Sequence, residues 1–138
     1  MGITVRIEFK VIPHKEQRYE TVGDWVDGKR VLKVRVSDLK DGRMEVLVFL
    51  HELIEAMLCK TAGVSQEEVD RWDEAYEVAR AKRGRKVAPC KCAFFVEPGE
   101  DPHAPYFLQH AVATQCEKML AKALDVDWEE YGRKVESL

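Results

Sequence analysis

The 138-residue chain lacks a large excess of charge of either sign, a visible export signal and a long uninterrupted apolar run. Its net charge of −3 gives no electrostatic support for binding to nucleic acid or to an anionic membrane. The N-terminus shows no basic segment followed by an apolar one, so we expect a cytoplasmic protein. The longest apolar stretch, residues 46–59, is interrupted by ionisable side chains, which argues against a transmembrane helix.

Cysteine is also scarce, with four residues in the chain: Cys59, Cys90, Cys92 and Cys116. In a cytoplasmic protein we expect these to be thiols instead of disulfides. Cys90 and Cys92 form a C-x-C pair, which differs from the C-x-x-C knuckle of structural zinc sites and would need two further ligands. Cys59 and Cys116 fall in predicted helices, where they are expected to act as small buried apolar residues.

The remaining composition is that of an ordinary globular protein, with 46% hydrophobic and 34% charged residues. The length suits one domain with one core, so residues 1–138 are predicted to form a single domain. We predict the α+β class, with a small antiparallel sheet of about three strands followed by about four helices.

The three predicted strands precede residue 38. The first has apolar residues at every second position, which predicts one buried face: Ile3, Val5, Ile7, Phe9 and Val11. A weaker strand covers residues 19–26, and a third covers residues 32–37 after a strong hairpin turn signal at residues 27–28.

Four helices are predicted after the strands. The first covers residues 43–62 and stops at Gly63. The second begins at a capping box formed by Ser65 and Glu68 and continues to residue 83. The third covers residues 105–124, and the last covers residues 128–135 after an aspartate cap. Residues 84–104 contain three prolines and no clear period, which predicts a functional loop in which residues 94–96 form a short strand or a core plug.

The most informative feature is the sequence His51-Glu52-Leu53-Ile54-Glu55 inside the apolar first helix. Ionisable groups in a buried helix are costly unless they are paired, neutralised or bound to a metal. At about 100° per residue, His51 and Glu55 share one face of the helix while Glu52 lies to the side. His51 and Glu55 are therefore candidate metal ligands, and Glu52 is a candidate general base acting on a metal-activated water.

A simpler interpretation stays open for the same residues. Glu52 and Glu55 can pair with nearby lysine or arginine side chains, with His51 a core histidine whose hydrogen bonds are satisfied. A short motif of this kind has a real rate of chance occurrence.

A zinc site needs a third protein ligand, and the other histidines are His14, His103 and His110. His110 lies on the predicted inward face of the third helix, and Glu117 shares that face seven residues later. We therefore choose His110 as third ligand and expect Glu117 to orient His51 from outside the ligand set, although Glu117 could instead cap a loop or pair with an arginine. His103, beside two prolines, is expected to be exposed, with a loop ligand as the alternative.

The order of strands, then a buried helix bearing H-E-x-x-E, then a later helix supplying a ligand, resembles the zincin metallopeptidases and implies a zincin-like fold. In their gluzincin branch the first helix carries two histidine ligands and a later helix carries a glutamate. In this chain the types are exchanged, with His51 and Glu55 on the first helix and His110 on the later one. The resemblance implies a hydrolase in which Glu52 is the general base. The carboxylate of Glu55, which stands where the family has its second histidine, makes manganese or iron an alternative to zinc.

A vaguer similarity links the chain to small uncharacterised proteins of phages and prophages. Two functional hypotheses follow. The first is a metallohydrolase, a peptidase or amidase acting on a peptide or small amide substrate. The second is a non-catalytic phage-type or host-interaction module that holds a structural metal or a metal-free buried polar network. The sequence leaves the oligomeric state open.

Overall fold

The computed structural model describes residues 5–83 and 97–138, and it has the predicted α+β class. The strands come first and the α-helices follow. One short 3-10 helix lies between the first two strands, and a second lies between the second and third α-helices. The elements are β1 (Arg6–Ile12), η1 (His14–Glu16), β2 (Gly23–Asp27), β3 (Val31–Ser37), α1 (Gly42–Ala62), α2 (Gln66–Arg83), η2 (Pro98–Glu100), α3 (Phe107–Ala123) and α4 (Trp128–Glu136). Cys90, Cys92 and residues 94–96, for which the sequence offered predictions, lie outside the described residues.

The sheet is mixed, so the prediction of an antiparallel sheet was wrong for one of its two pairings. The strand order is β1-β3-β2; β2 pairs antiparallel with β3, while β1 pairs parallel with β3. The hairpin between β2 and β3 closes with Gly28 N–H donating to the carbonyl of Val31 at 3.0 Å. From β1 the chain passes to β2 at the opposite edge of the sheet. It then turns back as β3, which lies between the two and runs parallel to β1.

The buried face predicted for β1 was also wrong. Ile7, Phe9 and Val11 are 44%, 38% and 42% exposed. The reason is that α1 packs mainly over β2 and β3, which leaves β1 at the margin of the covered face. Phe9 still reaches α1, where its ring stacks on Phe49 with 4.3 Å between the centroids.

The predicted helix signals were correct except at the start of the third helix, which begins at Phe107 and leaves Pro105 two residues before it. The side chain of Asp41 caps α1 by accepting from the amides of the first turn. The helix ends at Gly63, whose φ of 76° lies in the left-handed region that glycine adopts without strain. Ser65 N–H donates to Glu68 Oε2 at 2.8 Å, and Glu68 N–H donates to Ser65 Oγ at 3.2 Å, so the capping box precedes α2 as predicted.

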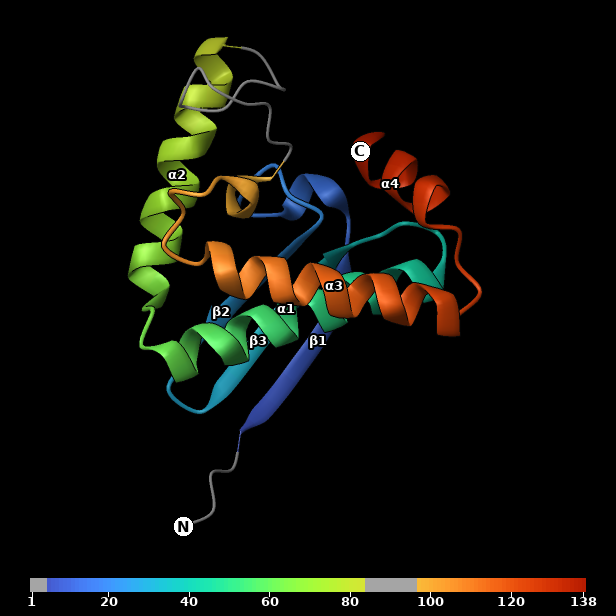
Figure 1. Ribbon diagram of the computed structural model, residues 1–138, viewed down its shortest axis with the longest axis horizontal. Coiled ribbons are helices and arrows are strands. Elements are labelled where there is room, and N and C mark those ends of the chain that lie inside the picture. Colours follow the sequence, from blue (N-terminus) through green and yellow to red (C-terminus); the bar gives the residue numbers. More distant parts are fainter. Residues whose placement is uncertain (1–4, 84–96) are drawn as a thin grey trace.

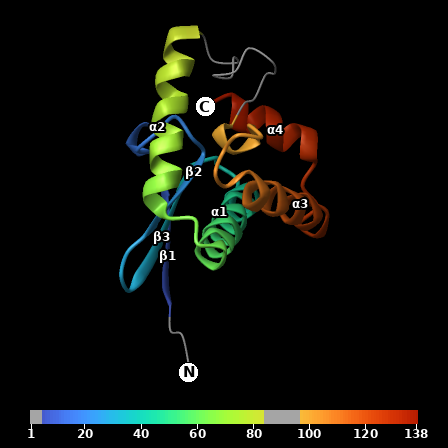
Figure 2. The same ribbon diagram turned by 60° about the vertical axis from the view of Figure 1, so that its left-hand side comes forward.

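Helix α1 lies between the sheet and α3, so the sheet, α1 and α3 follow one another as layers (Figure 2). This position explains its apolar sequence, because residues on opposite sides of the helix are buried. Helix α2 rises on one side of the α1–α3 pair and α4 on the other (Figure 1). No helix in the described part of the chain has both the length and the apolar character needed to cross a membrane.

Candidate metal centre

His51, Glu55 and His110 come together between α1 and α3, and they form a buried group that could hold a metal ion. Their exposed fractions are 6%, 5% and 6%. His51 Nε2 lies 3.3 Å from Glu55 Oε2 and 3.2 Å from His110 Nδ1. His110 Nδ1 lies 2.8 Å from Glu55 Oε2. The structure thus places the three predicted ligands in one cluster.

The separations of these atoms suit a tetrahedral ion. Ligand atoms at about 2.0–2.1 Å from a zinc ion lie about 3.3 Å apart along the edges of a tetrahedron. The two separations that involve His51 match this value, and the separation between His110 and Glu55 is shorter by about half an ångström.

The second ring nitrogen of His51 is held by a carboxylate on α3. His51 Nδ1 lies 2.7 Å from Glu117 Oε2, and Tyr131 on α4 donates its hydroxyl to Glu117 Oε1 at 2.5 Å. A proton on Nδ1 that is donated to Glu117 leaves the lone pair of Nε2 directed into the cluster. Carboxylates commonly fix metal-binding histidines in this way.

The other two candidate ligands have equivalent partners. His110 Nε2 lies 3.1 Å from Glu97 Oε2, so Nδ1 of the same ring faces the cluster. Trp25 on β2 donates from Nε1 to Glu55 Oε1 at 3.0 Å, which leaves Glu55 Oε2 for the cluster. Each candidate ligand therefore presents one atom to the cluster and has its other polar atom fixed from outside.

Without an ion, the same groups form a network of imidazolium and carboxylate groups. Burial opposes protonation of His110, but hydrogen bonds to Glu55 and Glu97 outweigh it and raise the pKa to about 10. Burial opposes ionisation of Glu55, but hydrogen bonds from His110 and His51 outweigh it and lower the pKa to about 2. Burial likewise opposes a charge on His51, yet hydrogen bonds to Glu117 and Glu55 raise its pKa. A metal ion would have to displace protons from both rings.

Glu52 differs from its neighbours because it makes no hydrogen bond or ion pair within residues 5–83 and 97–138. Burial, together with the charge of Glu55, raises its pKa. Its carboxylate borders a cavity that Glu55 and His110 also line. Strand β2 lies directly against it, since a Cβ added to Gly23 would be 2.7 Å from Glu52 Cγ. Glu52 thus borders the same cavity as Glu55 and His110, and its carboxylate is not paired with another described group.

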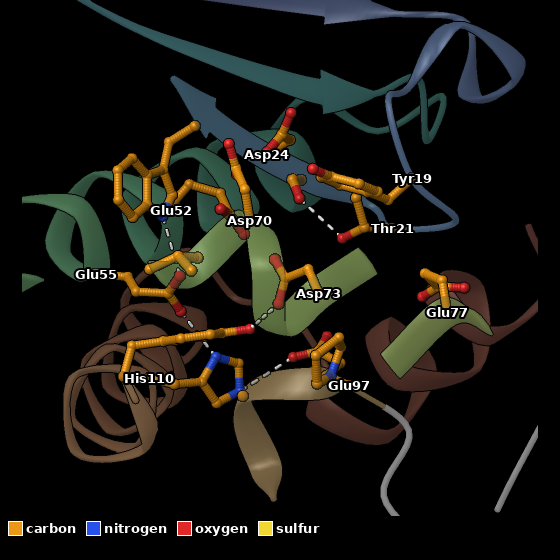
Figure 3. A pocket seen from close by; sticks show the side chains of 16 residues that line it. Tyr19, Thr21, Asp24, Glu52, Glu55, Asp70, Asp73, Glu77, Glu97 and His110 are labelled. Carbon is orange, nitrogen blue, oxygen red and sulfur yellow. Dashed lines mark hydrogen bonds and ion pairs between the residues drawn. The ribbon is translucent and has the colours of Figure 1, made fainter. Parts of the chain in front are cut away.

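Many carboxylates line the cavity beside Glu52, and three of them are paired with arginines, Asp24 and Asp70 with Arg18 and Glu77 with Arg80. Among the described residues, seven carboxylates line it, with no lysine or arginine: Asp24, Glu52, Glu55, Asp70, Asp73, Glu77 and Glu97. Figure 3 shows Glu55 and Glu97 on opposite sides of the His110 ring, with Asp73 nearby. Tyr106 donates to Asp73 Oδ1 at 2.5 Å, and burial raises the pKa of Asp73 to about 7 against this hydrogen bond.

Sequence reasoning missed the residues that support the cluster from outside, above all Trp25, Glu97 and Tyr131. They come from β2, from the start of η2 and from α4, and no spacing links them to the motif. A close backbone contact was also missed. The backbone of η2 passes so near His110 that a Cβ added to Gly99 would lie 2.5 Å from Cγ of the His110 ring. Local sequence signals do not report such tertiary contacts.

The remaining histidines lie apart from the cluster. His103 is 71% exposed, and its Nδ1 lies 3.0 Å from Asp101 Oδ1. His14 Nδ1 lies 2.9 Å from the hydroxyl of Ser37. Cys59 is buried, Cys116 is partly buried, and both are free thiols.

Comparison of the chain with protein-family models, with curated protein sequences and with solved structures gives no match. The chemistry of the site is therefore argued from its own residues.

Proposed function

We propose that the protein is a metal-dependent hydrolase of amide bonds, a peptidase or amidase with a zincin-like site. The observation that carries this proposal is the cluster of His51 Nε2, Glu55 Oε2 and His110 Nδ1 within 3.3 Å of one another. Three protein ligands of this kind leave a fourth position for water or substrate, as in catalytic zinc sites. Structural zinc sites are usually closed by four protein ligands, whereas three come together here among residues 5–83 and 97–138, which favours catalysis over a purely structural role.

A divalent ion bound there would polarise the substrate carbonyl and lower the pKa of a water molecule. The nitrogen and oxygen ligands suit zinc, with manganese or iron as alternatives because of the carboxylate. The protein's own contribution is made by Glu52, which is free to accept the proton of the attacking water and deliver it to the leaving nitrogen. His51 and His110 stay fixed during this transfer because Glu117 and Glu97 hold their outer nitrogens.

The strand beside the cavity is β2, which lies at one edge of the sheet. Strand β3 is central in the sheet, so both of its edges are already paired. Gly23, Asp24 and Trp25 of β2 line the cavity, so this end of the strand is where a substrate chain would lie. The absence of a side chain at Gly23 keeps the backbone of β2 close to Glu52.

A second candidate is a buried polar network that never binds metal. Its support is that the histidines and carboxylates of the cluster already satisfy one another, with His110 Nδ1 2.8 Å from Glu55 Oε2. In that case the protein would be a non-catalytic interaction module. A metal that only fastens α1 to α3 would serve the same kind of module.

Elemental analysis of untagged protein separates these candidates. We expect about one metal ion per chain in the wild type and in His103→Ala, which removes a histidine outside the cluster. His110→Ala should lose the metal. A wild type that holds no metal after zinc, manganese and iron are offered would establish the metal-free network. Metal retained without hydrolysis of any peptide or amide would instead favour the fastening role.

A further inference from the structure

A second cavity adjoins the candidate metal centre on the side of α4. It lies among α1, α3, α4 and η2, and His51 and Glu52 form part of its wall. The same Glu52 and Glu97 border the acidic cavity, so the two spaces share part of their walls. Of the clustered ligands, His51 lines this second cavity, and Glu55 and His110 line the acidic one.

The wall formed by α4 is apolar. Trp128, Tyr131 and Val135 follow one another at spacings of three and four residues, which puts them on one side of the helix. Tyr131 is buried, whereas Trp128 and Val135 are partly buried and border the cavity. Val22 and Val48 also line the cavity. An apolar wall of this kind suits an apolar side chain of a ligand.

Among the described residues, acidic side chains outnumber basic ones around this pocket, where His51 is the one basic group on the wall. Among the described residues, five glutamates line it and neither lysine nor arginine does: Glu52, Glu97, Glu100, Glu117 and Glu136. The acidic cavity beyond the cluster has the same character. A substrate with carboxylates near the reacting bond would be repelled from both sides, and one with positive charges would be attracted.

We infer that the substrate is a neutral or basic peptide whose side chain next to the reacting carbonyl is large and apolar and occupies the cavity against α4. This inference rests on the proposed function, because it places the reacting carbonyl at the metal centre. The occupant is part of the substrate and not a separate partner, since the cavity is lined by His51 of the cluster and by Glu52, the proposed general base.

The chain offers a variant that fills the pocket with little disturbance of the fold. Gly132 lies on α4 at the cavity, and a Cβ added there meets no atom within 4 Å. Gly132→Phe should therefore be tolerated in the helix while its ring enters the pocket. Arg133→Phe places the same ring at the next position, outside the lining of the pocket, and serves as the matched control.

The test measures binding by calorimetry to the zinc-loaded protein, with hydroxamates as metal-chelating probes. N-acetylleucine hydroxamate should bind about 10- to 100-fold more tightly than N-acetylglycine hydroxamate, from burial of the leucine side chain. Gly132→Phe should remove most of that advantage while still binding the glycine probe, and Arg133→Phe should keep it. Adding lysine before the leucine should strengthen binding at low salt, and adding glutamate should weaken it.

The outcomes separate this inference from the proposed function. Equal binding of the leucine and glycine probes, or an advantage that survives in Gly132→Phe, would overturn the substrate assignment even if amide hydrolysis is found. The expected binding pattern without hydrolysis of the matching peptides would uphold the pocket and overturn the hydrolase. A protein that binds no metal would overturn both, because the probes would then have no anchor.

Discussion

The hydroxyl of Tyr131 on α4 donates a 2.5 Å hydrogen bond to Oε1 of Glu117 on α3. The other oxygen of that carboxylate lies 2.7 Å from Nδ1 of His51 on α1. Three helices are thus joined through one chain of hydrogen bonds that ends at a candidate metal ligand. The position of α4 and the orientation of His51 are coupled as a result.

Tyr131→Phe should weaken metal binding by about tenfold, because loss of a group that orients a ligand's partner typically costs 10- to 100-fold. It should also lower the free energy of unfolding by about 1–3 kcal/mol, since Glu117 loses a buried hydrogen bond. Competition with a chromogenic chelator measures the first effect, and denaturant unfolding of the metal-free protein measures the second. An unchanged metal affinity would show that Tyr131 only packs α4.

Glu52→Gln should reduce amide hydrolysis by at least about 100-fold, because a general base of this kind contributes about 10²–10⁴ in rate. The metal content should stay at the wild-type level, since Glu52 is not one of the three clustered ligands. Steady-state rates and elemental analysis check the two statements together. The matched control is Glu129→Gln on α4, whose side chain is 87% exposed. Full activity in Glu52→Gln would rule out the proposed role.

The metal-free protein should lose stability as pH rises from 6.5 toward about 10. The pKa of His110 is raised from 6.5 to about 10, so its stabilising contribution is complete below pH 6.5 and is lost through pH 10. The pKa of Glu55 is lowered from 4.5 to about 2, so its contribution is complete above pH 4.5 and is lost as pH falls through 2. Both contributions are complete near pH 4.5–6.5, so the stability that His110 and Glu55 add should be greatest there in denaturant unfolding with a chelator present.

Added metal should reverse the alkaline part of this profile. Coordination needs neutral imidazoles, so the affinity rises as protons leave His51 and His110, and binding stabilises the folded state more at higher pH. Unfolding curves with and without zinc should therefore separate increasingly above pH 6.5. Coincident curves across this range would contradict metal binding at the cluster.

Gly99→Ala should disrupt the site, because its Cβ would lie 2.5 Å from Cγ and 2.6 Å from Nδ1 of the His110 ring. We expect reduced metal content and a loss of about 1–3 kcal/mol in the free energy of unfolding, as for other overpacked positions. Gly132→Ala is the matched control, since its Cβ meets nothing within 4 Å. That variant should gain about 0.5–1 kcal/mol from improved helix propensity and keep its metal.

The helices and the motif were accessible from the sequence because their signals are local. The apolar residues that flank the motif predicted that α1 is buried, and the four-residue spacing of His51 and Glu55 puts them on one face of any helix. Gly63 and the Ser65–Glu68 capping box marked helix ends through their own backbone preferences. His110 followed from the inward face of its helix.

The sheet was less accessible. Alternation in β1 predicted a strand but carried no information on its direction relative to β3 or on which strands α1 would cover. Ile7 and Phe9 are exposed because β1 lies at the margin of the sheet, a matter of helix placement that no local pattern records.

The sequence by itself determined the α+β class, the helix limits and a histidine–carboxylate pair on a buried helix, because all of these depend on residues a few positions apart. The tertiary structure decided the rest. It brought His110 to within 3.2 Å of His51, fixed the outer atoms of the ligands through Trp25, Glu97 and Glu117, and left Glu52 unpaired in the described part of the chain. Those contacts join residues far apart in the sequence, and they depend on how helices and strands pack.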